Sequence, residues 1–161
     1  MSIQIKDTLS PHLAAMARRF RDRKPILEAM GASLVATTAR SFREANLRAA
    51  PWPPKRDGSP ATLYKNGPLK QSIRITSVSN DSVTVGSDRK YAAIHQLGGV
   101  IRPKSAKVLR FISGGQVFFR KKVTIPARPF FPFIGNRMTD FAQRRIEAAV
   151  KAKVAALMRR P

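Results

Sequence analysis

The residue types that perform most enzyme chemistry are scarce in this chain and are not grouped. There is no cysteine, there are two histidines, and the nine Asp and Glu residues include no close pair. Acid–base catalysis, an activated nucleophile or a metal site needs such groups close together. His12 and His95 do not form a helical His-x-x-x-His pair, and neither a P-loop nor a dinucleotide-binding glycine pattern occurs. We therefore expect no catalytic residue, no metal, no cofactor and a protein that is not an enzyme.

His95 lies in the stretch YAAIHQLGG, residues 91–99. Tyr91, Ile94 and Leu97 have the spacing of one or two helical turns, and Gly98 can end such a turn with left-handed backbone geometry. A lone histidine is usually structural, with its ring donating to a backbone carbonyl. We interpret Tyr91, His95 and Gly98 as parts of a turn that locks two elements together.

The charge of the chain is extreme, with a formal net charge of +22. Self-repulsion of this size must be offset by packing, by counterions, or by an acidic or polyanionic partner. No acid occurs between Asp88 and Asp140. Many cations fall in that interval, and we expect seven of them to form a basic arm that contacts an acidic partner or DNA: Arg102, Lys104, Lys107, Arg110, Arg120, Lys121 and Lys122.

Helical periodicity marks both ends of the chain. Residues 1–24 form an N-terminal helical segment, with Ser10 as a cap before a first-turn proline. Pro25 starts a second helix whose apolar stripe predicts packing by one face only. Residues 136–158 read as a C-terminal helix with cations on its wet side and at its end. No segment has the basic and apolar regions of a signal peptide, or the roughly 20 apolar residues of a membrane span.

Two hairpins are predicted between these helices. The stretch 72–87 alternates as an antiparallel pair with one buried face. The stretch VLRFISGGQVFFR turns at Gly114-Gly115, which places Phe111 opposite Phe118. Apolar and basic residues then mix on both faces, so we interpret residues 99–124 as a projecting basic arm. The chain reads as one α+β domain, 1–161, with the N-terminal helices and the C-terminal helix packed on a small antiparallel sheet.

The proline-rich loop, residues 49–60, contains the only tryptophan. Trp52 stands between two prolines, so it has little entropy to lose on docking. It is either an anchor at the edge of the core or a partner-facing hot spot, and we favour the anchor. A second aromatic cluster follows in IPARPFFPF, where Phe130 and Phe131 belong either to the core or to a subunit interface. Arg128, before Pro129, can bond carbonyls or carboxylates with its planar fork.

The order of these motifs resembles the tailed-bacteriophage virion morphogenesis, or tail-completion, family. The resemblance spans about residues 26–150 and rests most on VGSDRKYAAIHQLGG and IPARPFFPF in that order. It implies a non-enzymatic structural protein of the virion, in the neck or at the tail end, that is needed for stable head–tail joining. It further implies a homo-oligomeric ring, assembled in the host cytoplasm, that contacts connector or adaptor, tail terminator or tail tube proteins.

Two alternatives stay open at this point. The basic arm and its phenylalanines also fit a small protein that binds nucleic acid without sequence specificity, through phosphate neutralisation and stacking. No helix-turn-helix, RNA-recognition or zinc-finger pattern supports sequence-specific reading. An unrecognised nuclease would require ligands from scattered positions. Within the virion, the arm could equally reach an acidic neighbour or DNA in the channel.

Overall fold

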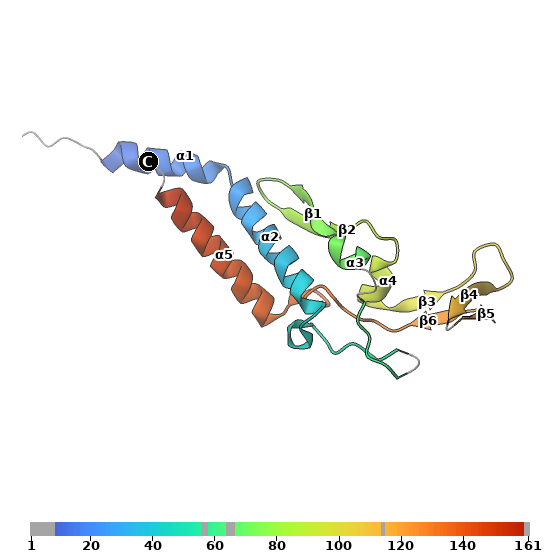
Figure 1. The fold of residues 1–161 in the computed structure, drawn as a ribbon. Coiled ribbons are helices and arrows are strands. Elements are labelled where there is room, and N and C mark those ends of the chain that lie inside the picture. Colours follow the sequence, from blue (N-terminus) through green and yellow to red (C-terminus); the bar gives the residue numbers. More distant parts are fainter. Residues whose placement is uncertain (1–8, 56–57, 64–66, 114, 160–161) are drawn as a thin grey trace, which may run out of the picture.

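The fold is built around one central helix. The structure is a computed structural model that describes residues 9–55, 58–63, 67–113 and 115–159. Its long helices are α1 (Leu9–Arg21), α2 (Lys24–Ser41) and α5 (Asp140–Met158). α5 packs along one side of α2, and the antiparallel hairpin of β1 (Ile73–Val78) and β2 (Val83–Ser87) covers the other side (Figure 1). The predicted α+β class is confirmed, although α5 packs mainly on α2 and reaches the sheet through it.

α2 carries small residues where its neighbours approach. It has a proline in its first turn, as predicted, but the expectation that it packs by one face only is wrong. Its buried residues are Gly31, Thr37, Thr38 and Ser41. A Cβ on Gly31 would lie 2.7 Å from the Cγ2 of Val83, so the glycine lets the hairpin sit close to the helix. The prediction followed the large apolar residues of α2 and therefore missed the second packed face, where the residues are small.

The ends of the chain differ from prediction in detail. α1 includes both Leu9 and Ser10, so the predicted cap at Ser10 is wrong, and residues 1–8 of the N-terminal segment lie outside the described residues. α5 begins at Asp140 instead of 136, because Thr139 caps it by accepting a hydrogen bond from the Ala142 N–H. The preceding residues form a small ladder, β7 (Phe133–Ile134) with β8 (Arg137–Met138).

Short helical turns connect these parts: η1 (Ala45–Leu47), α3 (Pro68–Gln71) and α4 (Ala92–Leu97). Beyond α4 the chain forms the arm, which projects from the helices (Figure 1). β3 (Gly99–Ile101) pairs with β6 (Val123–Ile125) at its base, and β4 (Leu109–Ser113) pairs with β5 (Gln116–Arg120) further out. Phe111 opposes Phe118 as predicted, and Gly114 of the predicted turn lies outside the described residues.

Candidate functional site

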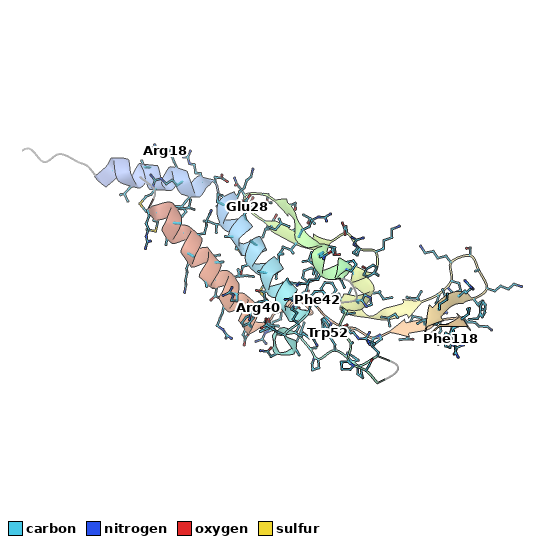
Figure 2. The ribbon with its side chains drawn as sticks, viewed as in Figure 1. Arg18, Glu28, Arg40, Phe42, Trp52 and Phe118 are labelled. Atoms are coloured by element: carbon cyan, nitrogen blue, oxygen red, sulfur yellow. The ribbon has the colours of Figure 1, made fainter. Side chains whose placement is uncertain are left out.

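Most of the predicted motif residues meet where the proline-rich loop, α4 and residues 126–132 come together, a place we call the junction. Trp52 is 8% exposed, and its indole Nε1–H donates to the carbonyl of Pro129 at 2.8 Å. Its ring packs edge-on against Phe42, with ring centroids 5.9 Å apart. Figure 2 shows these two side chains together at the end of α2. Trp52 is therefore the anchor of its loop.

Arg128 fastens the loop from the other side. Its Nε donates to the carbonyl of Pro53 at 2.9 Å, and its Nη2 donates to the carbonyl of Pro54 at 2.8 Å. Its backbone N–H donates to the carbonyl of His95 at 2.7 Å. Prolines have no backbone N–H and do not pair regularly in a ladder, so the carbonyls of this segment are available to a side-chain donor. One arginine thus ties the loop, α4 and the base of the arm into a single unit.

Two residues that sequence reasoning missed hold the aromatic segment. The Oε1 of Gln96 accepts hydrogen bonds from the backbone N–H groups of Phe130 and Phe131, both at 2.9 Å. The hydroxyl of Ser41, fully buried, donates toward the carbonyls of Phe130 and Thr38, at 2.7 and 2.8 Å. Gln96 lies inside the YAAIHQLGG stretch, so the motif contained the signal, but a glutamine gives no hint of its partners in sequence.

Phe130 was expected either in the core or at a subunit interface, and the structure places it in the core. It is 1% exposed, and its ring lies 5.5 Å from Phe42 and 5.0 Å from Phe131, centroid to centroid. Phe130 therefore belongs to the core of its own chain, while Phe131 is half-buried beside it. Pro129 contributes its carbonyl to Trp52 and is also half-buried.

His95 is held as part of this framework. Its ring meets Tyr91 edge-on at 5.8 Å, and its Nδ1 is buried without a hydrogen-bond partner among the described residues. The expected ring bond to a backbone carbonyl is therefore not made by that atom. Burial, followed by the charge of Arg128, lowers the pKa of His95 below its usual value. The imidazole is thus favoured in its neutral form.

Gly98 ends α4 with φ +72° and ψ −178°. The positive φ was expected, but the extended ψ differs from a left-handed turn, because the chain passes straight into β3. A Cβ at this position would lie 2.8 Å from the backbone nitrogen of Ala127. Glycine is therefore required here both for the backbone angle and for the close approach of the returning strand.

A hollow of about 360 Å³ lies beside the junction. Its lining includes Lys55, Tyr91, His95 and Arg128 over an apolar floor. Within the described residues, no three His, Cys, Asp or Glu side chains come together in a way that could hold a metal ion. Among the described residues, the lining of the hollow contains no Asp, Glu or Cys; the polar side chains that share it with His95 are Lys55, Thr62, Tyr91 and Arg128.

The arm presents a different surface. All seven predicted arm cations are exposed: Arg102, Lys104, Lys107, Arg110, Arg120, Lys121 and Lys122. Large apolar side chains are exposed among them, with Ile112 at 65% and Phe119 at 55%. Phe111 and Phe118 stack across the ladder at 5.7 Å on the opposite face, and Phe118 marks this region in Figure 2. The arm is therefore both cationic and apolar, unlike a merely solvated face.

Comparison with known protein families gives a match over most of the chain. The model of the phage virion morphogenesis family matches residues 4–155 of the chain. No curated protein and no solved structure shows a significant match. Among the described residues, no helix combines the length and the apolar character needed to cross a membrane.

Proposed function

The chain belongs to the phage virion morphogenesis family and so serves the assembly of a phage particle, and we propose that it is a structural subunit of the neck or tail-completion complex. In that role it stabilises the joining of heads to tails without catalysing a reaction. The family match extends over nearly the whole chain, so the proposed role is assigned to the helices and the arm together. The junction supports it as well, since the polar side chains of Trp52, Gln96 and Arg128 bind backbone groups and so fix chain segments.

The observation that carries the proposal is the arm. It projects from the helices, exposes cations and large apolar side chains together, and is fixed at its base by Arg128 and Gln96. An isolated two-stranded ladder is marginal in water and gains stability from a further layer. An arm that is held firmly at one end and uncovered at the other fits a part that docks against a neighbouring subunit.

The proposed assembly is a ring of several copies around the channel axis. A head-to-tail interface repeated by rotation closes such a ring, and each copy then offers its arm in the same direction. Each copy carries +22, and acidic neighbours would offset the repulsion between copies. Connector or adaptor, tail terminator and tail tube proteins are the proposed neighbours, and the neck or tail end of the virion is the proposed location.

The test uses phage in which production of the chain is blocked. We expect full heads and finished tails that stay separate in electron micrographs, and recovery of joined particles when the complete chain is supplied. A chain in which a short glycine linker replaces residues 102–122 should fold but not restore joining. Joined, infectious particles made without the chain would refute the proposal.

The seven exposed arm cations also favour a second candidate, a small protein that binds nucleic acid without sequence specificity. Light scattering after size exclusion, together with a DNA gel-shift assay, separates the two. A monomer that binds DNA tightly and is absent from virions would support the second candidate and contradict the first.

A further inference from the structure

A groove of about 520 Å³ lies between the base of the arm and the proline-rich loop. β5 and β6 form one wall, and Lys55 and Arg128 stand at the other side. Its apolar lining comes from four residues of the arm and the segment after it: Phe111, Val123, Ile125 and Pro126. The groove is thus distinct from the hollow that contains His95, although both share Lys55 and Arg128.

Four cations surround this apolar lining: Lys55, Arg120, Lys122 and Arg128. None of them forms an ion pair with a carboxylate in the described part of the chain, where the ion pairs all involve other arginines. Arg120 donates to the carbonyl of Phe119 and lies over the Phe118 ring, and Arg128 donates to proline carbonyls. Among its described lining residues, the groove therefore carries four positive charges and no carboxylate to offset them, which favours an anionic partner.

We propose that this groove binds an extended segment of a neighbouring virion protein in which acidic and apolar residues alternate. The inference rests on the proposed function for its partner, and it names the chemistry of that partner. In an extended segment, successive side chains point to opposite sides. Apolar side chains then cover Phe111 and Val123, while the carboxylates of the other side meet the cations at the rim.

The apolar lining favours a protein segment over DNA. A duplex offers phosphates to the cations but has no apolar side chains to cover Val123, Ile125 and Pro126. Base stacking is also limited, because Phe111 already stacks on Phe118. A second copy of this chain is a poor occupant, because its 31 cations outnumber its nine acids. An acidic and apolar segment satisfies both properties of the groove.

The experiment measures fluorescence anisotropy of short labelled peptides with the purified full chain. The probe alternates Glu and Leu, and its controls alternate Glu with Ser and Gln with Leu. The groove variant is Arg120→Glu with Lys122→Glu. The matched control, Arg144→Glu with Arg145→Glu, makes the same charge change at exposed positions of α5, away from the arm and the groove lining. If the groove variant melts early, Lys122→Glu alone serves, because the Lys122 side chain is exposed and has no hydrogen bond or ion pair among the described residues.

We expect the Glu–Leu peptide to bind, the groove variant to weaken it about tenfold or more, and the control variant to change it by less than about twofold. Equal weakening by both variants, or equal affinity for the Glu–Ser peptide, would overturn the inference. The inference would also be overturned if the Glu–Leu peptide did not bind and a duplex DNA fragment did, with DNA binding weakened only in the groove variant. That result would assign the groove to DNA. These results do not depend on particle assembly, so a failure here leaves the proposed function standing. Joined particles made without the chain would refute the proposed function and the identity of the partner, whereas the peptide result would stand.

Discussion

Removing the side chain of Gln96 tests whether one amide holds the aromatic segment in place. Gln96→Ala removes the acceptor of two part-buried N–H groups, each bonded at 2.9 Å. A net hydrogen bond contributes about 1 kcal/mol, and each orphaned buried donor costs about 1–3 kcal/mol. Gln96 also lines two surface hollows, so water can reach the donors after truncation and offset part of the loss. We expect a loss of about 2 kcal/mol in the free energy of unfolding.

Urea unfolding followed by the fluorescence of Trp52, the only tryptophan, measures this loss at the junction itself. With a slope of about 2 kcal/mol per molar urea, the midpoint should fall by about 1 M. Gln96→Glu keeps an acceptor oxygen in the place of Oε1 and should retain most of the stability. Gln143→Ala, which loses a surface bond to Glu147, should change it by less than about 0.5 kcal/mol. A Gln96→Ala variant as stable as the Gln143→Ala control would refute the reasoning.

Three further predictions concern packing, backbone geometry and pH. Gly31→Ala should lower the free energy of unfolding by about 1–3 kcal/mol, because the new Cβ would lie 2.7 Å from the Cγ2 of Val83. Gly86→Ala is the control and should not lower it, because its nearest contact would be 3.5 Å away. Equal melting temperatures for the two variants would contradict this. Gly98→Ala should cost about 2 kcal/mol or more through its positive φ and its contact with backbone, and an unchanged urea midpoint would exclude that strain. Because the pKa of His95 is lowered in the folded chain, the unfolded chain binds the proton more readily, so stability should fall as the pH drops below about 6.5. His95→Gln should reduce that slope, measured by urea titrations across the range, and a slope left unchanged would show that other groups cause it.

The elements that periodicity defines could be predicted, because their residues interact with near neighbours in sequence. The ladder of Phe111 with Phe118 follows from alternation around a glycine turn, and Pro25 marks the first turn of α2 because its ring suits that position alone. The start of α5 was missed, because Met138 continues the helical spacing by chance while it pairs with Phe133 in a ladder. The threonine cap at 139 was the better signal.

Long-range partners were beyond prediction for a physical reason. Trp52 and Arg128 were identified as important residue types, but their acceptors are backbone carbonyls, which every residue possesses. Gln96 and Ser41 likewise bond to the backbone of Phe130, far away in sequence. Sequence indicates which side chains can fix a segment, and only the fold decides which segment comes within reach. The groove was missed for the same reason, because Lys55 meets the arm only in three dimensions.

A reconstruction of the intact phage particle tests the central claim most directly, namely that the chain is a subunit that docks its arm on its neighbours. We expect density for several copies around the axis between head and tail, with the groove that contains Arg120 and Lys122 covered by an extended segment of another protein. A particle that is mature and infectious but lacks this density would contradict the claim.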